Sequence, residues 1–269
     1  MRGTTNSQDI FNLQRDDWNS EFFNRNFGIA KLNKPAFVEQ NVQNLSNQIQ
    51  KLLKLGYDKN FNLIQLDVGI EQSSLIEALQ ESAFHLVETK VIFVTEINDS
   101  AQILGKNDYK YCRLADMSDM DQIFNLTREA FTYNSSFYSR FKNRRYFSPD
   151  ETKKYYDAWV KNNLLKDGSF IAVYTKSKNI LGYTLILEKG LYADSKLYKA
   201  ALSAVRFDYW GKEIYSVLSN YAFCYIGLDK FFFDNTTQIT NLAMLRRYIK
   251  LKRNLSRIEH IFYWKPEAV

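Results

Sequence analysis

The chain contains little cysteine, histidine, proline or glycine. Two cysteines and two histidines among 269 residues are too few for a disulfide framework, a structural zinc site or a histidine-based metal catalyst. Three prolines and ten glycines exclude collagen-like and linker-dominated proteins. No apolar run reaches the ~18 to 20 residues of a membrane span, and the polar first residues lack the apolar core of a signal peptide. We therefore expect a cytoplasmic protein with no metal and no membrane partner.

The composition is that of a globular protein, with 45% hydrophobic and 25% charged residues. The net charge of +6 is unevenly distributed. Residues 1–105 hold 9 Lys and Arg against 13 Asp and Glu, a balance of −4, and residues 106–269 hold 27 against 17, a balance of +10. The segment 98–108 is polar, contains Gly105 and is typical of a linker. The sequence thus predicts two domains, 1–105 and 106–269, with a polyanionic ligand on the side of the second.

Hydrophobic spacing predicts an α/β half-domain in residues 10–100. The aromatic segment Trp18–Phe23 is interpreted as a loop and short strand. The remaining elements are a helix over 41–55 that stops at Gly56, a strand over 62–68, a helix over 73–82 capped by Ser73 or Ser74, and a strand over 84–94.

The second half has a different predicted order of helices and strands. Its predicted elements are strand 109–114, a turn leading into a helix through 131, helix 150–163, strands 170–174 and 180–187 joined by a turn at Lys178–Asn179, strand 199–205, helix 214–225, strand 231–234, helix 241–251 and strand 260–264. This order, β-α-α-β-β-β-α-β-α-β, resembles that of the GCN5-related N-acetyltransferase (GNAT) fold. Fold alone does not give function, so local motifs must carry the rest of the interpretation.

Four segments resemble one family within that superfamily, the dTDP-fucosamine acetyltransferases. They are Trp18–Phe23, Leu79–Glu88, Ser139–Phe141 followed by Tyr156–Asn162, and Asn241–Ile249. The resemblance extends from about residue 15 to 265. It implies an α/β (α+β) fold: a GNAT domain with a central mixed sheet over 106–269, preceded by a smaller α/β half-domain that faces the acceptor.

The resemblance also implies an activity. Members move an acetyl group from acetyl-CoA to the amine of a nucleotide-linked amino-dideoxy sugar, usually dTDP-linked, in the biosynthesis of surface polysaccharide such as lipopolysaccharide O-antigen. Another short acyl-CoA is an alternative donor. The resemblance further suggests a homodimer.

Tyr248 and Glu88 are the candidate catalytic residues. Acetyl transfer expels a thiolate, which a phenol with a pKa near its usual ~10 can protonate, and the matching tyrosine of the family is its proposed acid. A sugar amine arrives as an ammonium, and the glutamate of the Leu86–Val87–Glu88 segment matches the family's proposed base. The alternatives are a half-buried tyrosine on an amphipathic helix and an exposed strand glutamate. If Glu88 is the base and Tyr248 is the acid, the active site would lie between the two halves of the chain.

Three further residues have candidate binding roles by resemblance. An asparagine at the position of Asn241 contacts the cofactor in GNAT enzymes, and Asn241 is also a suitable helix N-cap. Arg140 and Phe141 lie in the segment that faces the sugar nucleotide in the family. Arg140 could bind a phosphate there or hold its loop through a carboxylate.

The loop Trp210–Tyr215 is the predicted cofactor site and departs from the family pattern. GNAT proteins bind the CoA pyrophosphate with backbone N–H groups of an R/Q-x-x-G-x-G/A loop, and the preceding strand bonds the pantetheine arm, here through Leu202, Ala204 and Val205. In this loop Gly211, Lys212 and Ile214 match a related form. Trp210 replaces its basic residue, and Glu213 and Tyr215 replace glycines. A glutamate adds a like charge and a tyrosine adds bulk where backbone must approach closely.

Three explanations of this loop are open. Both side chains point away and the backbone, including that of Tyr215, still binds the cofactor; the donor is another acyl carrier or is placed differently; or acyl transfer has been lost. The chain is therefore interpreted as an N-acyltransferase. The alternatives are a non-catalytic GNAT-like binding or assembly protein and a GNAT enzyme that acts on a protein or peptide amine.

The region from Asn241 to Arg257 is strongly basic. It carries Arg246, Arg247, Lys250, Lys252, Arg253 and Arg257. This is a solvated helix face or a positive wall that attracts the phosphates of the ligands. No nucleic-acid-binding motif accompanies the charge, so we expect no nucleic-acid partner.

Overall fold

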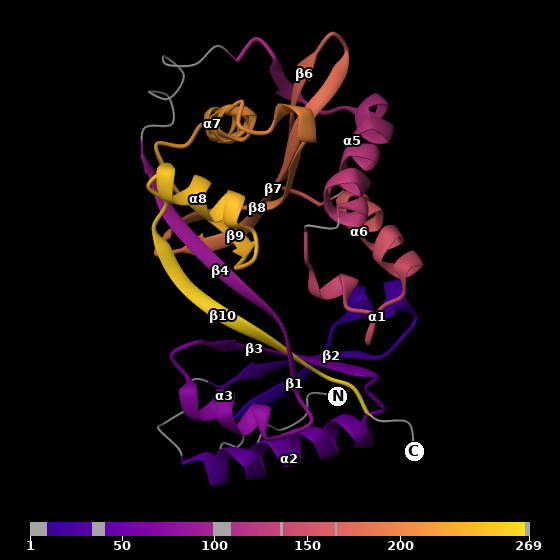
Figure 1. Ribbon diagram of the computed structural model, residues 1–269. Helices are drawn as coiled ribbons and strands as arrows, with labels where there is room; N and C mark the ends of the chain where they lie inside the picture. Colours follow the sequence, from indigo (N-terminus) through magenta and orange to yellow (C-terminus); the bar gives the residue numbers. More distant parts are fainter. Residues whose placement is uncertain (1–9, 34–40, 99–108, 135–136, 165, 267–269) are drawn as a thin grey trace. The chain divides into compact units, whose positions relative to one another are not determined.

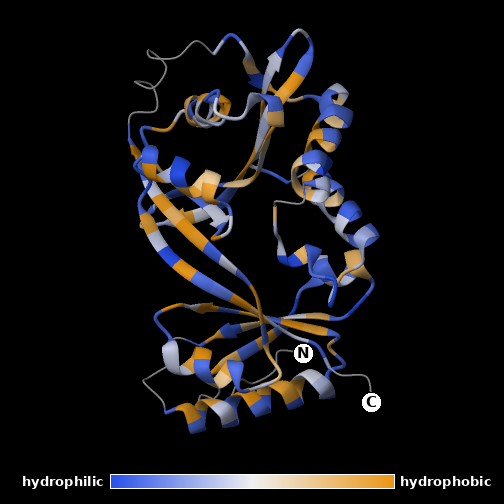
Figure 2. Ribbon diagram, viewed as in Figure 1, coloured by the Kyte–Doolittle hydropathy of each residue, from blue (hydrophilic) through white to orange (hydrophobic). Residues whose placement is uncertain are grey.

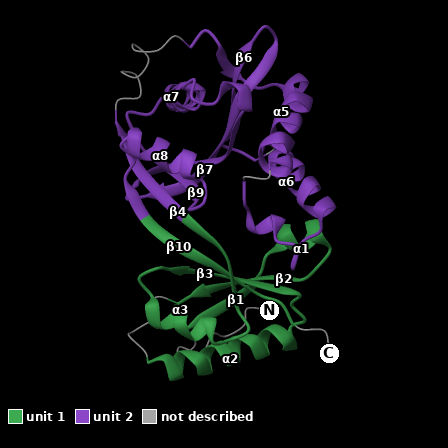
Figure 3. Ribbon diagram, in the orientation of Figure 1, with its two compact units in different colours: residues 1–90, 257–269 green, residues 91–256 purple. Residues whose placement is uncertain are grey.

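The computed structural model describes residues 10–33, 41–98, 109–134, 137–164 and 166–266 (Figure 1). Its contacts divide the chain into unit 1, residues 1–90 and 257–269, and unit 2, residues 91–256 (Figure 3). Strands β4 (His85–Asn98) and β10 (Leu255–Trp264) each begin in one unit and end in the other. All but the first residue of the predicted linker lies outside the described residues. The functional halves 1–105 and 106–269 stay a prediction.

Unit 1 contains a mixed sheet. Strand β1 (Phe11–Arg15) is antiparallel to β2 (Phe27–Leu32), which is parallel to β3 (Leu63–Gly69). Strand β10 pairs antiparallel with β3, from Glu259 opposite Gly69 to Trp264 opposite Ile64. The end of the chain thus completes the sheet that its beginning forms.

Two helices, α2 (Val42–Asp58) and α3 (Ser73–Gln80), cover one face of this sheet (Figure 1). Apolar and polar residues alternate along α2 with helical spacing (Figure 2), and its buried side chains include Leu45, Ile49 and Leu52. They pack in one apolar cluster with strand residues such as Ile64 and Leu66. The strands predicted over 62–68 and 84–94 and both of these helices are confirmed.

Three local predictions in unit 1 are wrong. Trp18–Phe23 forms helix α1 (Asp17–Phe23), because the Asp16 carboxylate accepts a hydrogen bond from the Asn19 N–H at 3.1 Å and caps the first turn. Neither predicted serine caps α3. Its N-cap is Gln72, whose side chain makes no capping bond. Gly56 does not end α2, which continues to Asp58.

Gly56 lies inside α2 because a larger residue does not fit there. A Cβ at this position would lie 2.7 Å from Ile64 Cδ1 and 2.8 Å from Trp264 Cζ3. The Trp264 ring is buried and also packs edge-on against Tyr57, with 5.0 Å between ring centroids. The close approach of the helix to the sheet thus explains the glycine at position 56. A helix-ending signal does not explain it, because the helix continues past this residue.

We predict that Gly56→Ala lowers the free energy of unfolding by about 1–3 kcal/mol, because overpacking against the Trp264 ring outweighs the higher helix propensity of alanine. Urea denaturation measures this. Asn47→Ala, at an exposed position of the same helix, is the control and should leave stability unchanged or raise it. Equal stability of Gly56→Ala and the wild type would contradict the packing explanation.

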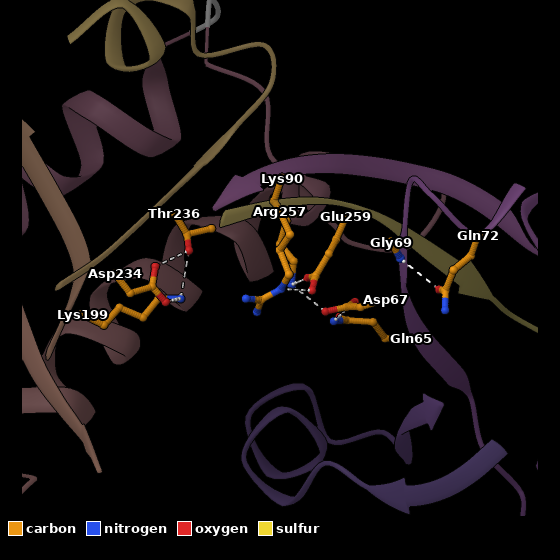
Figure 4. A network of polar contacts seen from close by, with 10 residues as sticks. All are labelled: Gln65, Asp67, Gly69, Gln72, Lys90, Lys199, Asp234, Thr236, Arg257 and Glu259. Carbon is orange, nitrogen blue, oxygen red and sulfur yellow. Dashed lines mark hydrogen bonds and ion pairs between the residues drawn. The ribbon is translucent and has the colours of Figure 1, made fainter. Parts of the chain in front are cut away.

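A charged network lies on the strands of unit 1 (Figure 4). Lys90 Nζ is 2.7 Å from Asp67 Oδ2 and 2.8 Å from Glu259 Oε2. The Arg257 Nε donates to Glu259 Oε1 at 2.6 Å. Burial by itself would lower the pKa of Lys90. The attraction of Asp67 and Glu259 and their hydrogen bonds together outweigh burial, so the pKa of Lys90 is raised. The lysine therefore stays charged, and the network links β3, β4 and β10.

Unit 2 contains the elements predicted for the second half except the last strand, 260–264, which lies in the unit 1 part of β10. Its further strands are β5 (Cys112–Leu114), β6 (Ser169–Lys176), β7 (Asn179–Tyr192), β8 (Ser195–Val205) and β9 (Lys230–Gln238). Its helices are α5 (Met120–Thr127), α6 (Pro149–Leu164), α7 (Ile214–Ile226) and α8 (Leu242–Lys250). Short helical turns are Met117–Asp119, the π-helical Arg128–Tyr133, Arg140–Lys142 and Phe207–Tyr209.

The strand order in unit 2 is β4-β9-β8-β7-β6-β5. Strands β8 and β9 are parallel, and the pairs from β8 to β5 are antiparallel. Helix α7 lies on one side of β6 and β7, and α5 and α6 lie on the other (Figure 1). The predicted turn is shifted by one residue to Ser177–Lys178. Both residues have positive φ, as a two-residue hairpin turn requires.

Candidate functional site

Strand β8 is partnered on both edges for only part of its length. It pairs with β7 as far as Val205, but in the described part of the chain its register with the parallel β9 covers only Leu197–Ala200. Beyond Ala200, one edge of β8 therefore offers backbone donors and acceptors to an extended ligand. The predicted cofactor residues Leu202, Ala204 and Val205 lie on this segment. Leu202 and Ala204 are buried, whereas Val205 is partly exposed.

The loop after β8 keeps the backbone conformation of a glycine-rich loop. Gly211 has φ +80 and Glu213 has φ +63, both in the left-handed region that normally favours glycine. Glu213 is the N-cap of α7, yet its side chain makes no capping hydrogen bond. The first N–H groups of α7 thus do not donate to the Glu213 side chain, although the Ser216 N–H donates to the Glu213 carbonyl at 2.9 Å. Ile214 anchors the helix by packing in the core with Leu218.

The Glu213 side chain points to α8. Its Oε1 accepts from Arg247 Nη1 at 2.7 Å and from Lys250 Nζ at 3.2 Å, and its Oε2 pairs with Arg247 Nη2. Arg247 also donates to Ser216 Oγ. The acidic residue of the loop is therefore neutralised by cations of the basic helix.

Tyr215 lies in the interior of unit 2 rather than over the loop. Its side chain is buried, and the Asn235 Nδ2 donates to its hydroxyl at 3.0 Å. Burial raises the pKa of Tyr215. The expectation that this tyrosine adds bulk at the cofactor loop is wrong, because its ring fills space beneath the helix.

Tyr248 joins the same buried group. Its ring centroid lies 6.1 Å from that of Tyr215 and 5.2 Å from that of Phe93. Burial raises its pKa well above the usual 10; the charge of Tyr215 and the hydrogen bond to it raise the pKa further, and nearby Arg253 lowers it. The expectation of an ordinary phenol pKa is wrong. Tyr248 is a fully protonated donor at neutral pH in this arrangement.

Asn241 and Lys212 lie at the edges of this region. The Asn241 Oδ1 accepts from the Met244 N–H at 3.3 Å, which confirms the predicted N-cap of α8. The Lys212 Nζ lies 4.4 Å from the centroid of the Tyr209 ring, a cation–π contact that orients the lysine beside the loop. Cofactor contacts of Asn241 and Lys212 stay predictions.

The remaining site candidates are positioned in other elements. Glu88 lies in the unit 1 part of β4 and is buried, so the alternative of an exposed strand glutamate is wrong. In unit 2, Phe141 is buried against Tyr155, with 3.9 Å between centroids, and the Arg140 guanidinium lies 4.5 Å from the Phe141 ring centroid. The catalytic role of Glu88 and the substrate roles of Arg140 and Phe141 stay predictions.

Sequence reasoning missed an aromatic pair and a buried amide. Phe207 is 76% exposed, and its ring centroid lies 5.0 Å from that of Trp210, whose Nε1 donates to the Val205 carbonyl at 2.8 Å. Two large aromatic residues, Phe207 and Trp210, in an otherwise polar loop could have indicated this pair from the sequence. Asn235 gave none, because it reads as an ordinary position of an alternating strand.

Two absences hold for the described residues. Within these ranges no three His, Cys, Asp or Glu side chains are grouped to hold a metal ion. No helix in the described part of the chain is long and apolar enough to cross a membrane.

We predict that Glu213→Gly is more stable than Glu213→Ala by about 1 kcal/mol. Both variants remove the carboxylate and its ion pairs, but only alanine retains the cost of a side chain in the left-handed conformation. Urea denaturation of the two variants measures the difference. Equal stabilities would mean that residue 213 does not hold positive φ in solution.

We predict that Tyr215→Phe lowers the free energy of unfolding by about 1–2 kcal/mol, because the buried Asn235 amide loses its acceptor. Thermal and chemical denaturation measure the change. Tyr225→Phe, at an exposed position of the same helix, is the matched control and should be neutral. A neutral Tyr215→Phe would contradict the buried hydrogen bond.

Comparison with known proteins gives the fold. No protein-family model matches the chain, and no curated protein matches it. Similar solved structures include a GCN5-related N-acetyltransferase from Sphaerobacter thermophilus, with TM-score 0.56 and 11% identity over 99% of this chain and 84% of that chain. Another, from Kribbella flavida, has TM-score 0.52 and 10% identity over 90% and 82%. A conserved protein of unknown function from Staphylococcus epidermidis has TM-score 0.60 and 12% identity over 90% and 85%.

These likenesses confirm the predicted fold class. The chain has the mixed α/β fold of the GCN5-related N-acetyltransferases.

Proposed function

We propose that the chain is an N-acyltransferase that takes its acyl group from acetyl-CoA or another short acyl-CoA. The observation that carries the proposal is the continuous path of backbone from the open edge of β8, residues 201–205, to the left-handed loop and α7. The amides of a pantetheine arm hydrogen-bond an open strand edge as an added strand does. Phosphates bind N–H groups at a helix N-terminus.

The proposed reaction forms an N–C bond and breaks a C–S bond. The amine attacks the thioester carbonyl, whose oxygen accepts a hydrogen bond from a backbone N–H of residues 202–205. Glu88 accepts the proton of the ammonium, directly or through water, before the amine attacks. Tyr248 gives its phenolic proton to the departing thiolate sulfur, and the second proton, which the nitrogen loses as the amide forms, returns to the Tyr248 phenolate. The proposed role of Glu88 as the base is supported by the Leu86–Val87–Glu88 segment and by the burial of Glu88 in β4.

The proposed acceptor is a nucleotide-linked amino-dideoxy sugar, with Arg140 and Phe141 on its side of the site. The support is the resemblance of the segments around these residues and Glu88. A panel of amines distinguishes this acceptor from a protein or peptide: release of free CoA thiol should be faster with a dTDP-linked amino sugar than with lysine peptides. The reverse preference would favour the peptide enzyme.

A second candidate function is a non-catalytic GNAT-like binding protein. The ion pairs of Glu213 with Arg247 and Lys250 favour it, since they place a carboxylate beside the loop where phosphates would bind. Calorimetric titration with acetyl-CoA separates the two functions. Micromolar binding supports the enzyme, and no heat of binding at millimolar ligand supports the scaffold.

We predict that Tyr248→Phe lowers turnover by more than tenfold and changes acetyl-CoA affinity less than twofold, because the phenol acts on the leaving thiolate and does not hold the donor. Turnover is measured by thiol release and affinity by calorimetry. Tyr225→Phe is the control for loss of a tyrosine hydroxyl. Wild-type turnover in Tyr248→Phe would remove this residue from the mechanism.

A further inference from the structure

The contact between Glu213 and α8 has the geometry of an occupied anion site. Arg247 and Lys250 are three residues apart and lie on the same face of α8. Arg247 meets both carboxylate oxygens of Glu213, Lys250 meets one of them, and Ser216 adds a hydroxyl beside the guanidinium. The Arg247 side chain is 15% exposed, whereas those of Glu213 and Lys250 are 50% and 71% exposed. The Arg247 side chain is thus largely buried, whereas the Glu213 carboxylate and the Lys250 side chain are open to solvent.

Glu213 is an unusual occupant of this position. It holds a left-handed backbone that disfavours any side chain, and its side chain makes no capping hydrogen bond to the helix that it precedes. Its ion pairs are half-exposed, and such pairs contribute little net stability in water. The carboxylate is therefore held weakly enough to be displaced by a stronger anion.

A phosphate is such an anion. The planar guanidinium fork matches phosphate oxygens as well as carboxylate oxygens, and the lysine adds a point charge that interacts more strongly with a multiply charged group. Glu213 can rotate into solvent, because half of its side chain is already exposed.

We propose that Arg247, Lys250 and Ser216 form a phosphate subsite for the acyl donor, and that Glu213 occupies this subsite as an internal carboxylate until the donor displaces it. This inference rests on the proposed function, because it assigns the subsite to the diphosphate of a CoA thioester. Glu213 then sets the donor affinity: the loop retains the backbone for binding, and its carboxylate lowers the affinity by competition. This competition explains why position 213 holds a glutamate where the related loop pattern has glycine.

Calorimetric titration with inorganic pyrophosphate tests the subsite. Glu213→Gln removes the competing charge with little change in side-chain size, and we expect pyrophosphate to bind it about fivefold more tightly than the wild type. Asp121→Asn, which removes a negative charge from an exposed position of α5, should leave the affinity unchanged. Circular dichroism melts confirm that each variant is folded.

Arg247 supplies the second arm of the test. In an Arg247→Gln background, Glu213→Gln should give a much smaller increase in pyrophosphate affinity, because the cation that contacts both carboxylate oxygens is gone and only Lys250 remains. An equal increase with and without Arg247, or no increase in Glu213→Gln alone, would overturn the subsite.

Titration with CoA distinguishes failure of the subsite from failure of the proposed function. CoA affinity should rise in Glu213→Gln by the same factor as pyrophosphate affinity. Equal CoA binding by wild type and Glu213→Gln would overturn the inference and leave the acyl donor in place. No CoA binding by either protein would overturn the proposed donor, and with it the assignment of this subsite to CoA.

Discussion

The connection between the start of α7 and helix α8 is the constraint on which the candidate site depends. Two residues at the start of α7 contact α8: Glu213 pairs with Arg247 and Lys250 on the surface, and Tyr215 bonds Tyr248 in the interior. These are the two positions where the related loop pattern has glycine. The substitutions thus do not simply obstruct a loop. They join the proposed phosphate-binding segment to the helix that carries the proposed acid.

Under the proposed function, this connection couples binding of the acyl donor to the environment of the proposed acid. Tyr215 receives a hydrogen bond from the buried Asn235 amide and one from Tyr248. The phenol of Tyr248 is accordingly protonated at neutral pH, and burial makes it a weak acid. In the proposed reaction it donates its proton as a thiolate develops beside it, since an unsolvated thiolate is a strong base in a dry site. Arg253 is the nearby cation that opposes the rise in pKa.

Much of the fold could be predicted from sequence because hydrophobic spacing reports directly on helices and strands. The helices at Val42–Asp58 and Ile214–Ile226 and the order of elements along the chain after residue 109 follow from it. Glycine at position 56 was misread, because its cause is a tertiary contact with Trp264 that no local pattern contains. The aromatic segment at 18–23 was misread because the Asp16 cap was overlooked.

The candidate site was predictable only in part, for the same reason. The loop, Tyr248 and the basic helix could be found by motif and charge. Where the side chains of Glu213 and Tyr215 point could not, since that depends on partners 34 and 20 residues away in sequence. A crystal structure of the chain with bound CoA is the most direct test of the account. We expect that structure to show the pantetheine arm along residues 201–205 of β8, Arg247 in contact with a phosphate, and the Glu213 side chain turned into solvent. CoA bound elsewhere, with the Glu213–Arg247 pair intact, would contradict it.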